Sequence, residues 1–127
     1  MSFTNFLETE ILDHVFAGAS YTAPGTHYLA LFTAIANGET GSVTELSGNA
    51  YARQSVAFTT SGDTTSNNAA VEFPTATGSW GTVTHVGVYD ASTSGNLMAY
   101  ATLSSSKAID TGDVFRVPSG DLDITLN

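Results

Sequence analysis

The stretch from Gly78 to Leu103 constrains the fold more than any other part of the chain, because it predicts two strands joined by a turn. Residues 82–89 are mostly β-branched and aromatic, and residues 97–103 mix leucine, methionine, tyrosine and threonine with alanine. Residues 90–96 between them are turn formers. The first strand carries apolar groups on both faces, so we expect it at the centre of a sheet that is covered on both sides.

Within this strand the expected faces follow simple alternation. Thr84, Val86 and Val88 are predicted to share one face, and Val83, His85, Gly87 and Tyr89 the other. The only tryptophan, Trp80, stands just before the strand, where a large ring can close one end of a core.

One helix is expected, at the N-terminus, over about residues 3–17. Seven apolar side chains recur there at helical spacing, with acidic residues between them. Asn5 followed by Glu8 resembles a capping box, Thr4 is an alternative cap, and Gly18 can end the helix. A segment this rich in aromatic residues must bury its apolar face, either against its own sheet or against a neighbouring chain.

The rest of the chain predicts short strands separated by turns. Residues 34–50 predict a long irregular segment, residues 59–68 a wholly polar loop, and residues 111–113 a tight turn. One helix and seven or eight strands indicate a mainly β fold, an antiparallel β-sandwich or a small jelly-roll or Greek-key barrel, in a single domain over residues 1–127. The further strands are expected at residues 27–33, 51–58, 69–73, 114–117 and 122–126.

Composition excludes several classes of function. Three basic residues stand against twelve acidic ones, a net charge of −9, so the chain cannot neutralise a phosphate backbone and we expect no nucleic acid partner. The absence of cysteine excludes disulfides and thiolate chemistry. No apolar run approaches the ~18 residues of a membrane span, and the N-terminus lacks the basic leader of a secretory signal.

Three histidines are the residues best suited to catalysis: His14, His27 and His85. His27 and His85 could be neighbours across a sheet, with Asp90 beside them, although hydrogen-bonded structural histidines are the simpler interpretation. The chain has no Gly-x-Ser-x-Gly elbow, no His-Glu-x-x-His motif and no phosphate loop. We therefore expect neither an enzyme nor a cofactor.

Acidic pairs could bind a metal ion. Asp121 and Asp123 share one strand face, and Asp110 and Asp113 flank a turn. Their spacing does not match an Asp-x-Asp-x-Asp-Gly loop, so we expect no metal site and assign these carboxylates to solubility.

Aromatic side chains could form a carbohydrate-binding platform. Most of them alternate into predicted strand faces, which favours core packing or contacts between subunits. The residues concerned are Trp80, Tyr21, Tyr28, Tyr51, Tyr89 and Tyr100.

A series of segments in fixed order resembles a known family. The most specific is the Trp-Gly-Thr-Val-Thr-His block at residues 80–85, within the segment 80–91. Read together, the segments are similar to small bacteriophage virion proteins commonly labelled tail-fibre-like proteins. The others lie at residues 10–18, 28–33, 44–53, 66–67, 71–74, 95–100 and 109–113.

The resemblance implies a non-enzymatic structural protein on the surface of the virion, made in the cytoplasm of the bacterial host. A fibre shaft needs long repetitive trimeric segments and none is present, so a capsid-decorating (cement) protein and a tail-associated protein both stay open. A host-glycan-binding receptor module is the alternative, and exposure of Trp80 or of several tyrosine rings in one groove would favour it.

The implied partners are other virion proteins, either the major capsid protein or tail proteins. We also expect a homo-oligomer, a trimer, since closed symmetric assemblies are the default for such parts. The expected contacts are the helix face and the segment around residues 34–50. The residues assigned to them are Phe3, Phe6, Leu7, Glu45 and Tyr51.

Overall fold

The computed structural model describes residues 1–126, which form eleven strands, one α-helix and one 3-10 turn. The helix α1 (Asn5–Phe16) follows a two-residue strand, β1 (Ser2–Phe3). Three long strands form the body: β2 (His27–Asn37), β8 (Gly81–Tyr89) and β9 (Leu97–Ile109). The shorter elements are η1 (Gly38–Thr40), β3 (Ser42–Glu45), β4 (Gln54–Val56), β5 (Phe58–Ser61), β6 (Thr64–Asn67), β7 (Val71–Glu72), β10 (Arg116–Val117) and β11 (Asp123–Thr125).

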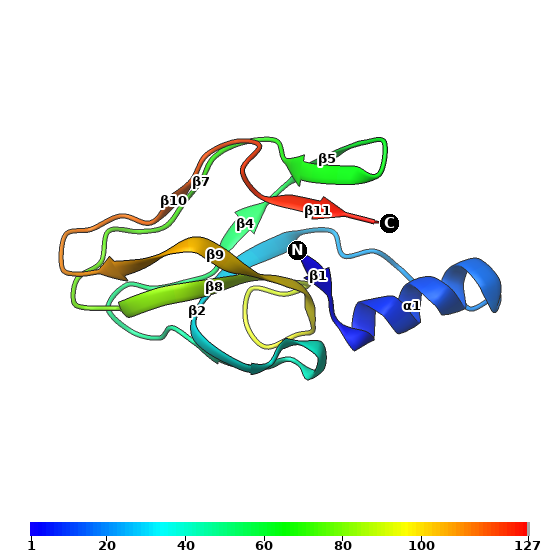
Figure 1. The fold of residues 1–127 in the computed structure, drawn as a ribbon, viewed down its shortest axis with the longest axis horizontal. Coiled ribbons are helices and arrows are strands. Elements are labelled where there is room, and N and C mark those ends of the chain that lie inside the picture. Colours follow the sequence, from blue (N-terminus) through cyan, green and yellow to red (C-terminus); the bar gives the residue numbers. More distant parts are fainter. Residues whose placement is uncertain (127) are drawn as a thin grey trace.

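The largest sheet is antiparallel, with the order β1-β9-β8-β2-β3 and with β4 also paired to β2. Two small antiparallel sheets, β10-β7 and β11-β6-β5, lie on one side of it, and α1 projects from one end (Figure 1). This arrangement confirms the expected mainly β fold with an N-terminal helix. Within residues 1–126 the sheets pack together without closing into a barrel.

The predicted hairpin is at the centre of this sheet, as expected. β8 pairs with β2 on one side and β9 on the other, and apolar side chains cover both faces. Leu29 and Leu31 of β2 belong to the main core, whereas Ala30 and Phe32 belong to a smaller cluster on the opposite face, which also includes Tyr89. Strict alternation along β2 therefore supplies both cores.

One detail of the predicted alternation was wrong. Val83 was expected opposite Val86 and Val88, but all three lie in the main core. The register of the β8–β9 pair is irregular between Val83 and His85. Across this shift Thr84 is the single β8 residue between the paired positions, whereas β9 supplies residues 103–106, so the regular alternation of faces is interrupted there.

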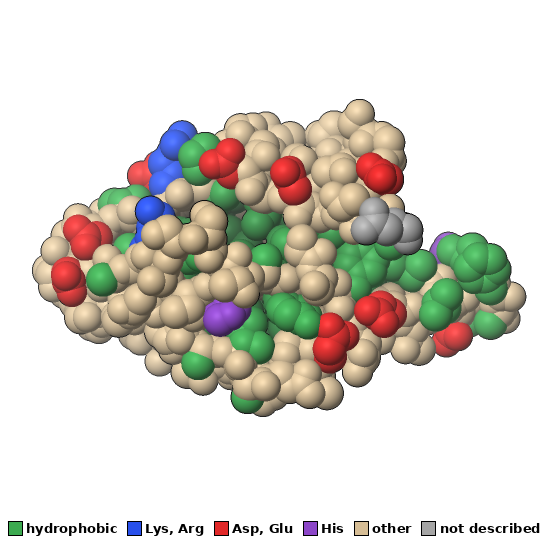
Figure 2. Space-filling view, viewed as in Figure 1, with side chains coloured by type: hydrophobic (Ala, Val, Ile, Leu, Met, Phe, Trp, Pro, Cys, Tyr) green, Lys and Arg blue, Asp and Glu red, His purple; other side chains and the backbone are tan. Residues whose placement is uncertain are grey.

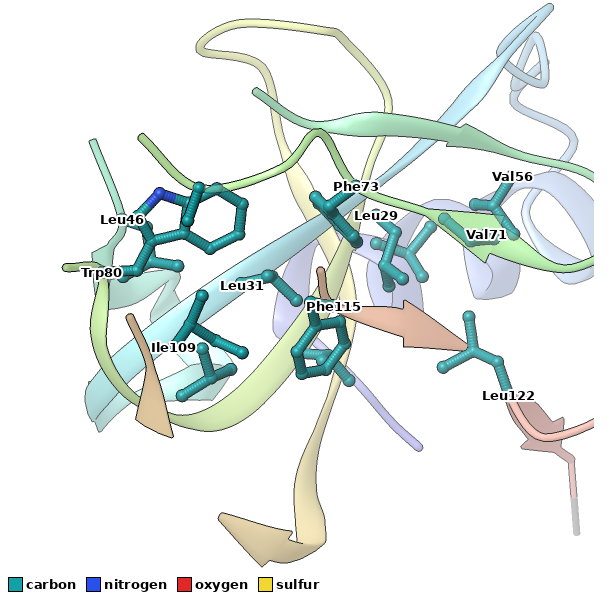
Figure 3. Close-up of a cluster of buried hydrophobic side chains, with 14 residues drawn as sticks. Leu29, Leu31, Leu46, Val56, Val71, Phe73, Trp80, Ile109, Phe115 and Leu122 are labelled. Carbon is teal, nitrogen blue, oxygen red and sulfur yellow. The ribbon is translucent and has the colours of Figure 1, made fainter. Parts of the chain in front are cut away.

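The main core lies between the large sheet and the small ones (Figure 3). Trp80 is 5% exposed and closes one end of it, as expected, with its indole Nε1 donating to the carbonyl of Asn49 at 2.8 Å. The buried side chains of this core are Leu29, Leu31, Leu46, Val56, Val71, Phe73, Ala76, Trp80, Val83, Val86, Val88, Ile109, Phe115 and Leu122.

Several polar stretches that predicted loops are strands. Part of residues 34–50 extends β2 and forms β3, and residues 59–68 form most of the β5–β6 hairpin, which turns at Gly62. β9 continues through residues 104–109, which were expected outside the strand. Threonine and serine fit a pleated strand even where no apolar alternation is present. Pairing with a neighbouring strand therefore decides whether these segments become strands or loops.

Four predicted strands are shorter than expected. In the stretch 51–58, residues 51–53 lie outside the strands, and Ala57 separates β4 from the start of β5. The other three, expected at residues 69–73, 114–117 and 122–126, are reduced to β7, β10 and β11.

Candidate assembly surface

The start of the N-terminal helix is fixed by Thr4, which is almost fully buried. Its Oγ1 accepts from the N–H of Leu7 at 3.4 Å and donates to the carbonyl of Leu97 at 2.6 Å. Thr4, the alternative cap, is therefore the N-cap that forms, in place of the Asn5–Glu8 capping box. The same hydroxyl joins the helix to β9.

The end of the helix is also defined. The N–H groups of Ala17 and Ala19 both donate to the carbonyl of Asp13, and Gly18 between them has φ +75°. This confirms Gly18 as the stop, since a left-handed residue there lets the last carbonyls find donors. His14 Nδ1 accepts from the N–H of Tyr21 at 3.2 Å, which holds the following segment against the last turn.

Most of the helix's apolar surface is not covered. No residue of α1 is buried, and Leu12, Val15 and Phe16 are 57%, 59% and 80% exposed. We call these three residues the helix tip. Burial against the helix's own sheet is limited to its first turns, where Phe6 and Leu7 are half-buried.

An apolar pocket of about 260 Å³ lies beside the base of the helix. Figure 2 shows apolar side chains in this region, between β11 and α1, and again at the far end of the helix. The walls of this pocket come from β1, α1, the central sheet and the small β11-β6-β5 sheet. The residues that line this apolar pocket are Phe3, Leu7, His27, Phe58, Thr65, Val88, Met98, Ala99 and Ile124.

The five expected contact residues fall into two groups. Phe3 pairs with Ala99 in the β1–β9 ladder and lines the apolar pocket with Leu7, whereas the Phe6 ring lies edge-on to Tyr21 at 6.4 Å. Sequence reasoning placed the contact face at these first turns and did not single out the exposed tip. The high aromatic content of the helix, with Phe16 at its end, was the available signal.

The second group, Glu45 and Tyr51, belongs to a network inside the chain. The Tyr51 hydroxyl donates to Glu45 Oε2 at 2.7 Å and accepts from the N–H of Leu31 at 3.1 Å. Arg53 contacts both carboxylate oxygens of Glu45 and lies over the Tyr89 ring, 3.6 Å from its centroid. Burial, together with the hydrogen bond to Glu45, raises the pKa of Tyr51 far above its usual range. Contact of either residue with another chain stays a prediction.

The aromatic residues do not form an open platform. Trp80 is buried, and Tyr51 stacks on Phe73 and meets Trp80 edge-on, at centroid distances of 6.1 and 5.6 Å. Tyr100 donates to Glu39 at 2.5 Å, and its ring covers the backbone of Gly38. The rings considered for carbohydrate binding are therefore largely used in packing.

The histidines are separated. In the β2–β8 ladder, His85 faces Phe32, whereas His27 lies just beyond the Tyr28–Tyr89 pair at the other end. Burial lowers the pKa of His27, and its ring packs edge-on to Phe58 at 6.1 Å. The suggestion that His27 and His85 are neighbours was wrong, because they lie five ladder positions apart on β2.

The acidic pairs are used in local hydrogen bonding. Asp113 Oδ2 accepts from the N–H of Asp110 at 2.9 Å, and Asp123 accepts from the hydroxyl of Ser66. Among residues 1–126, no three histidine or acidic side chains gather closely enough to hold a metal ion. Over the same residues, no helix has the length and apolar character to cross a membrane.

Comparison with known families identifies the chain. The family model described as podophage GP4 fiber I protein gp80 matches residues 2–125. The chain belongs to this family. It is thus a virion-associated phage fibre protein. The proteins of this family are structural components and are typically non-enzymatic. Among curated proteins, none matches the chain.

Proposed function

We propose that this chain is a compact structural module of the phage fibre, exposed on the particle surface and bound to other tail or fibre proteins. The observation that carries this proposal is the family match over residues 2–125, nearly the whole chain. The fold is consistent with it, since a packed β body with a projecting helix suits an attached module better than a repetitive shaft.

The module assembles as a homo-oligomer, and we expect a trimer. The uncovered helix supports self-assembly because exposed apolar surface of this kind marks contact sites in soluble proteins. The tyrosines and Trp80 give little support to the glycan-binding alternative, since their rings pack within the chain.

Localisation on the intact particle tests the proposal. Density at side-chain resolution, or labelling of this chain, should place it on the tail or its appendages, in sets of three copies. Density at many symmetric points over the head shell would identify a capsid-decorating protein instead and would overturn the fibre assignment.

A further inference from the structure

We propose that the helix tip of one copy inserts into the apolar pocket of a second copy. The inference rests on the proposed function for its expectation of self-assembly, and it names the surfaces that would bring the copies together.

The helix tip is a preformed apolar projection. Leu12, Val15 and Phe16 are each more than half exposed. The Gly18 turn and the contact between His14 and the Tyr21 backbone hold this end of the helix in place. Docking the tip would therefore cost little ordering entropy.

The apolar pocket suits such a projection. An apolar cavity of about 150 Å³ is enough to hold benzene, and this pocket, at about 260 Å³, can accept a phenylalanine ring. Most of its walls are aliphatic or aromatic, and its polar members, Thr65 and His27, carry no fixed charge at neutral pH.

The tip cannot fill the pocket of its own chain. Leu7 forms part of the pocket wall, and Phe16 lies nine residues further along a straight helix, about 13 Å away at ~1.5 Å per residue. Figure 1 shows α1 leading away from the body, so an occupant must come from another molecule.

A second copy is the occupant that uses both surfaces. Each chain carries one tip and one pocket, so exchange between copies covers both, whereas an unrelated partner seated on one leaves the other exposed. Phe16 alone, at 80% exposure, offers roughly 120–200 Å² on the ~150–250 Å² scale of an aromatic side chain, and Leu12 and Val15 enlarge this surface. One tip in one pocket buries less than the ~1,200 Å² at which specific interfaces begin, so the contact is weak by itself and is stabilised when the copies close into a ring that uses every tip and every pocket.

Charge gives an independent readout. The chain has a net charge of −9, so copies repel one another while the proposed contact is apolar. Salt should therefore strengthen self-association by screening that repulsion. A contact built on ion pairs would weaken with salt.

The first test is the oligomeric state of the full chain by light scattering and sedimentation, over a range of concentration and at low and high salt. We expect an oligomer that Phe16→Ser weakens by about tenfold or more, as for a buried aromatic anchor. The matched control is Val114→Ser, since Val114 is an exposed apolar residue away from the helix. A monomer at all concentrations, or equal effects of the two substitutions, would overturn the proposal.

The second test uses the absence of native cysteine. A chain carrying both Phe16→Cys and Thr65→Cys should form a disulfide between copies under mild oxidation, because Thr65 lines the pocket. Val114→Cys with Thr65→Cys should not. If Phe16→Cys alone cross-links as well as the double variant, the tips meet each other and the pocket is not the site.

The two proposals fail separately. Cross-linking by the Phe16 and Thr65 cysteines with density on the head shell would keep the contact and reject the fibre location. A tail location with a monomeric chain would do the opposite.

Discussion

Arg53 and Glu45 form a two-point ion pair, with Nε 2.9 Å from Oε2 and Nη2 2.8 Å from Oε1. The Arg53 side chain is 7% exposed, and its remaining nitrogen, Nη1, donates to the carbonyls of Ala91 and Ser94 at 2.9 and 2.7 Å. One guanidinium thus joins the end of β3 to the loop between β8 and β9. This loop leads directly into the β9 residues that hold Thr4 and the helix.

Arg53→Lys should destabilise the chain by about 2 kcal/mol, because an ammonium cannot reproduce the fork that bridges Glu45 and the loop carbonyls. Denaturant unfolding measures this loss. Lys107→Ala, at an exposed cation, is the control and should change stability by less than about 0.5 kcal/mol. Equal effects of the two would mean that the ion pair contributes nothing specific.

The free energy of unfolding should fall as pH rises above about 10. The folded pKa of Tyr51 is raised by burial and by Glu45, so above the ordinary tyrosine pKa the unfolded chain releases its proton while the folded chain keeps it. The stability from this group is complete below the unfolded pKa and is lost toward the folded one. Tyr51→Phe should flatten the decline above about pH 10, measured by thermal unfolding. An unchanged slope would assign the decline to other tyrosines.

Gly87→Ala should cost about 1–3 kcal/mol, because a Cβ there would lie 2.6 Å from the Phe32 ring and 2.7 Å from Leu97 Cδ1. Gly25→Ala is the matched control, since nothing lies within 4 Å of its Cβ position, and it should be nearly neutral. A second substitution, Phe32→Leu, should make Gly87→Ala less costly than it is alone. Additive losses in the double variant would contradict a clash with the Phe32 ring and would leave Leu97 as its source.

Asn67→Ala should destabilise the chain by about 2–4 kcal/mol. The buried Asn67 amide donates to the carbonyls of Ala69 and Pro118 at 2.9 Å and accepts from the N–H of Leu122 at 2.9 Å. Its removal leaves these groups unpaired and loosens residues 118–122, although the backbone pairing of β11 with β6 remains. Amide hydrogen exchange should therefore rise first around Leu122. The control is Asn68→Ala, at an exposed neighbour, which should leave exchange there unchanged.

The candidate assembly surface was only partly predictable. Helical spacing indicated an apolar face at the N-terminus. Contact of this face with a neighbouring chain remains a proposal. The pocket was not predictable, because its walls come from Phe3, Phe58, Met98 and Ile124, which are far apart in the sequence. At Tyr51 a local pattern predicted too much regular structure. Its alternation with Arg53 predicted a strand, whereas in the structure both residues lie outside the strands and belong to a hydrogen-bonding network.

The sequence by itself determined the central hairpin, the helix with its Gly18 stop, the mainly β class and the family, because each depends on local periodicity or on an ordered set of motifs. Tertiary structure alone decided which polar segments became strands, how the irregularity at Val83 placed a valine in the core, and that the helix tip stays uncovered. The physical reason is that strand pairing and burial depend on neighbours distant in sequence, whose positions no local pattern records.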